Sequence, residues 1–259
     1  MAASKVKVLE KALFILTQFL EQEEFSFHDL QRISGYNRTT LYRILQSFVT
    51  HSFLGQDPLT KNYKVSANTI RLAGAAIDNM KFLPVCRPYL KKLVQASRET
   101  SFVAILEGTN IVVVDLEHSK MDAQVNVSLG KIVPAYATGA GKALLASLDP
   151  GDLKDLLKEI IFEKFTDNTI KNKKQFEESL KETSKKGYGV SRGEYDPDII
   201  ATGASVYGAH GRVVAAIAIA ALDSRVNGEA KIRNHGKLLS STAADISNAL
   251  GFRAITKPR

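Results

Sequence analysis

The sequence NRTTLYRIL, residues 37–45, decides the fold of the N-terminal third of this chain. Asn37 is suited to cap a helix that begins at Arg38 and runs to about His51. Its apolar residues recur on one face at helical spacing, and these are Leu41, Ile44, Leu45, Phe48 and Val49. Helical geometry places a second set on the opposite face, namely Arg38, Thr39, Tyr42, Arg43 and Gln46.

Two further helices are predicted before this one. An amphipathic pattern predicts the first over Lys5 to Gln22. Ser26 stands three residues before Asp29, a capping-box spacing, and Gly35 is placed to end the short second helix. A helix, a short helix, a tight turn and a helix form the pattern of a helix-turn-helix, whose last helix enters the DNA major groove. The alternative for this pattern alone is a plain three-helix scaffold.

The segment after the third helix predicts a β-hairpin. Residues 53–65 are typical of a strand, a turn over Asp57 to Lys61 and a returning strand. A basic hairpin behind a recognition helix is a wing, which can lie on the DNA backbone or reach the minor groove. With Arg43 suited to a bidentate contact with guanine and the hydroxyls suited to phosphates or bases, the candidate DNA-binding residues are Ser26, Arg38, Thr39, Thr40, Tyr42, Arg43, Gln46 and Lys61.

The charge pattern agrees with a polyanionic partner. The 259 residues carry a formal net charge of +8. From Gly35 to Ala67 the basic residues Arg38, Arg43, Lys61 and Lys64 face Asp57 as the one acid. The lysines between residues 154 and 186 are matched by acids at helical spacings, so they are interpreted as solvated helix faces.

Several other classes of protein are excluded by composition. No apolar run is long enough to cross a bilayer and no signal peptide is recognisable, so we expect a cytoplasmic protein without membrane contact. The single cysteine, Cys86, allows no internal disulfide and is interpreted as a buried apolar residue. The five histidines show no short-range pairing, so neither a metal nor another cofactor is expected.

The run Gly139-Ala140-Gly141-Lys142 is not a phosphate-binding loop. That loop requires a glycine where this chain has Tyr136 and a hydroxyl where it has Ala143. Two interpretations remain for these small residues. They allow the backbone to approach an anionic ligand at a helix start, or they allow close helix packing.

The C-terminal two thirds are predicted to be α+β. Strands are expected at 101–106, 111–116, 123–127, 189–193, 201–207 and 213–222, with helices at 85–98, 141–147, 151–158, 174–186 and 229–250. The run 213–222 is apolar on both sides and is therefore expected to be a central strand. The predicted domains are 1–67 for DNA binding, a helical linker over 68–84 that ends at Pro84, and 85–259 for ligand binding.

The chain resembles the isocitrate-lyase-regulator (IclR) family of bacterial transcription factors. The resemblance rests on residues 37–45, on the Asp-Pro-x-Thr-x-x-Tyr pattern of 57–63, on 134–143 and on 186–191, and it reaches to about residue 251. It implies a winged helix-turn-helix joined to a GAF-like α+β effector domain. It also implies homodimers paired through the DNA-binding halves, often homotetramers, and control of a catabolic operon by a small organic effector.

The resemblance also implies the positions of the effector site. Position by position they fall on Asp122, Gly139, Ala140, Ser191, Ala201, Ala218 and Ala220. The last three are often cysteine or serine in relatives that hold small oxoacids, so the alanines predict an effector bulkier or more apolar than pyruvate. Arg192 and Glu194 follow Ser191, and the sequence leaves open whether they bind the ligand or pair with each other at the rim.

The sequence thus predicts a ligand-responsive regulator, without enzymatic activity, that binds double-stranded operator DNA. The alternative from another class is a small-molecule sensor or enzyme whose N-terminal domain serves assembly only. A regulator is expected to retard its own upstream DNA with a steep dependence on salt.

Overall fold

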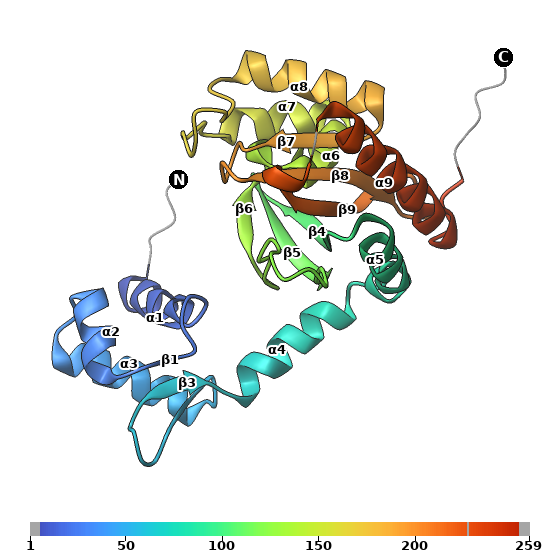
Figure 1. Ribbon diagram of the computed structural model, residues 1–259. Coiled ribbons are helices and arrows are strands. Elements are labelled where there is room, and N and C mark those ends of the chain that lie inside the picture. Colours follow the sequence, from blue (N-terminus) through green and yellow to red (C-terminus); the bar gives the residue numbers. More distant parts are fainter. Residues whose placement is uncertain (1–5, 227, 254–259) are drawn as a thin grey trace. The chain divides into compact units, whose positions relative to one another are not determined.

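The computed structural model describes residues 6–226 and 228–253, and the chain divides into two compact units at Met80 and Lys81 (Figure 1). This boundary falls inside the predicted linker segment 68–84. Each unit is built around its own core, as expected for a chain of this length.

The N-terminal unit is a winged helix-turn-helix. Its elements are α1 (Lys7–Gln18), β1 (Glu24–Phe25), α2 (Phe27–Ser34), α3 (Arg38–Thr50), β2 (Leu54–Gln56), β3 (Tyr63–Val65) and α4 (Ala67–Asp78). β3 is the central strand of a small antiparallel sheet in the order β1-β3-β2. The core packs the three helices on this sheet and contains Ile15, Phe19, Phe25, Leu30, Leu41, Ile44, Leu45, Leu54 and Tyr63.

The predicted helices are present, with differences at the first. Helix α1 ends at Gln18, before the predicted Gln22, and the predicted start at Lys5 lies outside the described residues. The strand β1 was not expected, because two residues are too few to show an alternating pattern. Helix α2 begins with the predicted capping box and ends at Gly35, whose φ of 66° is the left-handed conformation that favours glycine.

Helix α1 has two apolar faces. Ile15 faces the core, whereas Val8, Leu9 and Leu13 are 61%, 55% and 52% exposed. In the sequence these buried and exposed apolar residues form one wide stripe. The width of the stripe does not show which of its residues pack in the core of this chain and which stay exposed.

The C-terminal unit is a six-stranded antiparallel sheet with helices on both faces. Its elements are α5 (Leu83–Ser97), β4 (Thr100–Glu107), β5 (Asn110–Glu117), β6 (Ile132–Pro134), the 3₁₀ turn η1 (Ala135–Ala137), α6 (Gly139–Ala146), α7 (Pro150–Glu159), α8 (Lys173–Lys186), β7 (Gly189–Arg192), β8 (Ile199–Tyr207), β9 (Val213–Leu222), the 3₁₀ turn η2 (Asp223–Arg225) and α9 (Glu229–Ala249). The strand order is β6-β5-β4-β9-β8-β7. α6 packs on β8 and β7 and is covered by α8, while α5 and α9 pack together and contact β4 and β8 respectively (Figure 1).

The central strand is as predicted. β9 lies between β4 and β8, and its residues from Ala215 to Ala221 are buried. One face of this region packs on α6, and the other packs Ile200 and Ala221 against Ile232 of α9. Burial on both faces explains why the run shows no alternation.

One predicted strand is wrong. Residues 123–127 form no strand, although Val125 and Val127 are buried between exposed neighbours as in a strand. The loop is held instead by single contacts, such as the Thr100 hydroxyl that donates to the Val125 carbonyl over 3.2 Å. The edge strand in this part of the sheet is β6, which the sequence analysis missed.

Pro84 does not simply end the linker helix. Helix α4 ends at Asp78, and Pro84 lies in the first turn of α5. Backbone N–H groups in the first turn of a helix have no acceptor within the helix, so proline is tolerated there. The described residues contain no helix long and apolar enough to span a membrane.

Candidate functional site

The outward face of α3 presents a polar surface. Asn37 caps the helix as predicted, with its Oδ1 accepting the Thr40 N–H over 2.8 Å. Leu41, Ile44 and Leu45 point into the core and fix the rotation of the helix. The predicted contact residues Arg38, Thr39, Tyr42 and Arg43 are exposed, whereas Thr40 and Gln46 are half-buried. No intramolecular ion pair involves Arg38 or Arg43 within the described residues, so both guanidinium groups are available to a ligand.

Ser26 is placed differently from the other predicted DNA contacts. Its hydroxyl accepts the Asp29 N–H over 3.1 Å and donates to the Asp29 carboxylate over 2.6 Å. These two bonds commit the side chain to the start of α2. The Ser26 hydroxyl thus uses both its donor and an acceptor position to cap α2, without any contact to DNA.

The wing is stabilised by its own turn. Asp57 Oδ1 accepts the N–H groups of Leu59 and Thr60, both over 2.9 Å, and these bonds hold the pKa of the Asp57 carboxyl below its usual range. Lys61 follows with a φ of 59°, a conformation uncommon for a residue with a side chain. Leu59 and Lys61 are exposed at the end of the hairpin, so the cation lies at the tip as predicted.

Three of the predicted effector positions come together in one cavity of the C-terminal unit. Ser191, Ala201 and Ala220 line it, with Ala137 and Thr138 at the start of α6. The remaining walls are largely apolar and come from β4, β5, β6 and the loops 125–131 and 195–199, with side chains of Phe102, Ile111, Val113, Val125, Asn126, Val127, Lys131, Val133, Tyr195, Asp196 and Ile199. The volume of this cavity, which is open to solvent on one side, is about 80 Å³. Because it contains three of the predicted effector positions, we refer to this cavity as the effector pocket.

The small residues at 139 and 140 serve close packing. A Cβ added at Gly203 of β8 would lie 2.5 Å from the Cα of Ala140, and one added at Gly139 would collide with the backbone of Ala201. Gly139, Ala140 and Ala218 are buried and are not among the residues that line the pocket. Close packing is therefore what the structure shows for these positions. Thr138, the N-cap residue of α6, does line the pocket, and its hydroxyl accepts the Gly141 N–H over 2.9 Å.

Asp122, Arg192 and Glu194 lie away from the pocket walls. Asp122 is exposed in the loop after β5. Arg192 and Glu194 do not pair with each other, which excludes one of the alternatives that the sequence left open. Arg192 pairs with Glu229 over 2.6 Å on the surface, and Glu194 pairs with Lys142 over 2.5 Å in the interior.

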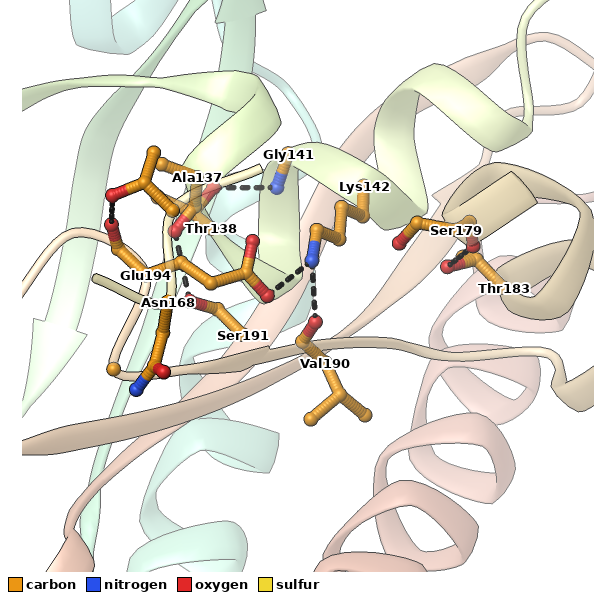
Figure 2. Close-up of polar contacts among 12 residues, drawn as sticks. Ala137, Thr138, Gly141, Lys142, Asn168, Ser179, Thr183, Val190, Ser191 and Glu194 are labelled. Atoms are coloured by element: carbon orange, nitrogen blue, oxygen red, sulfur yellow. Dashed lines mark hydrogen bonds and ion pairs between the residues drawn. The ribbon is translucent and has the colours of Figure 1, made fainter. Parts of the chain in front are cut away.

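The Lys142–Glu194 pair anchors the loop that follows β7 (Figure 2). The Lys142 ammonium also donates to the Val190 carbonyl over 2.9 Å, while burial lowers the pKa of this lysine against the opposing effect of Glu194. The Ser191 hydroxyl donates to the Ala137 carbonyl over 2.8 Å, and Thr169 donates to the backbone of Glu194 over 2.6 Å. These contacts fix the pocket side of β7 against α6.

Sequence reasoning missed most of the pocket lining, including Lys131, Tyr195 and Asp196, which lie in loops. Gly130 could have indicated a turn before Lys131, because glycine readily adopts the φ of 77° found in the turn that leads into β6. The larger cavity between α6, α8 and α9, of about 540 Å³, contains none of the predicted effector positions. Cys86 is buried, which raises its thiol pKa to about 12, and the described residues contain no group of three or more candidate metal ligands.

Two family models match the chain. The model "IclR helix-turn-helix domain" matches residues 8–58, and the model "Bacterial transcriptional regulator IclR C-terminal" matches residues 74–248. The chain belongs to the IclR family of transcriptional regulators. It is therefore a DNA-binding regulator and not an enzyme, which removes the assembly-only alternative.

Curated relatives and a solved structure agree with IclR membership. The chain is 30% identical over 254 residues to the transcriptional repressor AllR of Klebsiella pneumoniae, covering 97% of this chain and 93% of AllR. It is 26% identical over 250 residues to the transcriptional regulator XynR of Escherichia coli, covering 96% and 99%. The fold is also that of an IclR homolog from Microbacterium hydrocarbonoxydans complexed with 4-hydroxybenzoate, with a TM-score of 0.78, 17% identity and coverage of 94% and 98%.

Proposed function

We propose that this IclR-family protein binds operator DNA through the outward face of α3 and the wing, and that a small organic acid in the effector pocket controls this binding. The observation that carries the proposal is the position of Arg38 and Arg43, two unpaired cations on a capped and well-packed helix. Because α3 is fixed by its buried face, its outward side chains enter a groove as a preformed surface.

We infer that a homodimer binds the DNA, with a homotetramer as a further assembly. Support comes from the exposed apolar face of α1, formed by Val8, Leu9 and Leu13, since an apolar surface of this kind marks a protein interface. A twofold dimer places two recognition helices on successive turns of the major groove, so we expect a palindromic operator. A protein with this partner acts in the cytoplasm.

The effector is inferred to be an acid with an apolar or aromatic body, and the operon to be catabolic. Thr138 at the start of α6 lines the pocket, so we infer that a carboxylate binds near the N-terminus of this helix, between walls that are largely apolar. Ala201 and Ala220 line the pocket without a hydrogen-bonding group, so a small oxoacid leaves contacts unmade there. The Microbacterium homolog, which binds an aromatic acid, supports the same class.

Two variants, Arg43→Ala and Lys61→Ala, test the DNA interface. We expect Arg43→Ala to weaken specific binding by roughly 1–3 kcal/mol and to relax discrimination between sequences, because a bidentate base contact is lost. We expect Lys61→Ala to weaken binding uniformly and to lower the salt dependence. Binding is measured by fluorescence anisotropy on the native promoter and on scrambled DNA over a range of salt concentrations.

The DNA proposal fails if wild-type protein shows no preference for its native promoter over scrambled DNA, with or without candidate acids. An equal loss for Arg43→Ala on all sequences refutes the base contact alone. The effector class is tested by thermal shift against aromatic, acyl and small oxo acids, and stabilisation by the smallest acids alone contradicts it.

A further inference from the structure

The effector pocket has polar groups at two separate places. One is the start of α6 at Thr138, and the other is the turn between β5 and β6 at Lys131. Strand β6 and the turn η1 lie between them in the chain, and the three residues of β6 span about 10 Å at roughly 3.3 Å per residue. Lys131 and Val133 both line the pocket, as expected for strand positions two residues apart. The pocket is therefore lined by a lysine just before β6 and by the helix cap that follows β6 and η1.

The ammonium group of Lys131 is available for a ligand. It lies 5.8 Å from the centroid of the Tyr195 ring, and Tyr195 is supported by Phe165 at 5.0 Å between ring centroids. In the described part of the chain no carboxylate forms an ion pair with Lys131. The lysine is half-buried and Tyr195 is 36% exposed, which places both at the mouth of the pocket.

Asp196 is the other charged residue that lines the pocket. One of its carboxylate oxygens accepts the Asp198 N–H over 3.1 Å and so belongs to the turn before β8. It forms no ion pair with Lys131, so this carboxylate does not occupy the lysine ammonium. Asp196 opposes an anion at the mouth, which makes its neutral variant a matched control for the lysine.

The volume of the effector pocket sets where a larger ligand must extend. About 80 Å³ has room for roughly five to eight water-sized groups, if each needs about 10–15 Å³. A ligand bulkier than a small oxoacid that places one carboxylate at α6 therefore extends toward Lys131. An apolar group at that point gains nothing from the ammonium, whereas an acidic group forms a charge-assisted hydrogen bond with it.

We propose that the effector carries a second acidic group, bound by Lys131 above the Tyr195 ring, and that it is a dicarboxylic acid with an apolar spacer. This inference rests on the proposed effector function of the pocket. It makes Lys131 the residue that distinguishes diacids from monoacids, a role that neither the α6 amides nor the alanine walls can supply.

The test is isothermal titration of the full-length protein with matched pairs of acids. The pairs are terephthalate with 4-methylbenzoate and adipate with hexanoate, which differ only in the second acidic group. We expect wild-type protein to bind the diacid about tenfold more tightly than the monoacid, the size of one charge-assisted hydrogen bond. We expect Lys131→Met to remove this preference and to change monoacid affinity less than about twofold, while Lys131→Arg retains the preference.

Asp196→Asn is the control for a general disturbance of the mouth. It removes a like charge, so we expect diacid affinity to be unchanged or higher. Equal binding of diacid and monoacid to wild-type protein overturns the inference, as does an unchanged preference in Lys131→Met. Both of these outcomes leave the pocket assignment intact. If none of the four acids binds, the pocket assignment is contradicted as well. The DNA proposal is tested separately, by promoter binding.

Discussion

Removing one partner of the Lys142–Glu194 pair is expected to destabilise the C-terminal unit strongly. The two side chains are 3% and 10% exposed, and the second oxygen of Glu194 has no hydrogen-bond partner. Lys142→Met leaves this carboxylate buried without its cation, a change that typically costs about 3–5 kcal/mol. At roughly 2–4 °C per kcal/mol for a unit of this size, the melting temperature falls by about 6–20 °C.

The double variant Lys142→Met/Glu194→Met separates loss of a charge from loss of packing. Replacing both members of a buried pair by apolar residues is often neutral or stabilising, so we expect the double variant to recover most of the loss. The matched control is the exposed pair of Lys158 and Asp155, for which Lys158→Met is expected to change stability by less than about 0.5 kcal/mol.

Differential scanning calorimetry of the full chain measures wild type and the three variants, and the transition of the C-terminal unit is assigned by its shift in Lys142→Met. The reasoning is refuted if Lys142→Met melts within about 2 °C of wild type. It is also refuted if the double variant is as unstable as Lys142→Met, since the pair would then contribute through packing alone.

Three other changes test local features of the structure. Asn37→Ala removes the cap of α3 and should cost about 0.5–2 kcal/mol of unfolding free energy in urea titrations, with a parallel loss of promoter affinity. Gly203→Ala introduces a Cβ 2.5 Å from Ala140 and should cost about 1–3 kcal/mol or more; a melting temperature equal to wild type would show that the α6 packing can relax. Burial lowers the pKa of His235, with Lys231 adding to the effect, so the unfolded chain takes up the proton first as the pH falls below about 6.5. Stability should therefore decrease on acidification through that window, and His235→Gln should flatten this part of the pH profile in urea titrations at pH 7.5 and 5.5.

The helix-turn-helix and wing were predictable because local chemistry determines them. Asn37 caps α3, Ser26 and Asp29 close a capping box, and the Asp57 turn is formed within five residues. Such signals lie within a few residues of each other and remain readable without a three-dimensional context.

The effector pocket was predictable only in part, because its walls come from distant segments. Ser191, Ala201 and Ala220 were found through the family resemblance, whereas Lys131 and Tyr195 lie in loops without a periodic pattern. The partner of Glu194 is 52 residues away in sequence, and no spacing rule could have indicated it. The false strand at 123–127 shows the converse case, in which alternating burial arises without a neighbouring strand.

The contact between α6 and β8 has a consequence for how new ligand preferences can arise in this protein. Where Gly139 meets Ala201, which lines the pocket, main chain touches main chain, and any added atom must displace a whole element. That wall is closed to gradual change by single substitutions. The opposite wall, with Phe102 of β4 and Lys131 and Tyr195 in loops, consists of side chains that can be exchanged one at a time. Selection for a different metabolite is therefore expected to keep the residues on the α6 and β8 side of the cavity and to substitute those on the side of β4 and the loops.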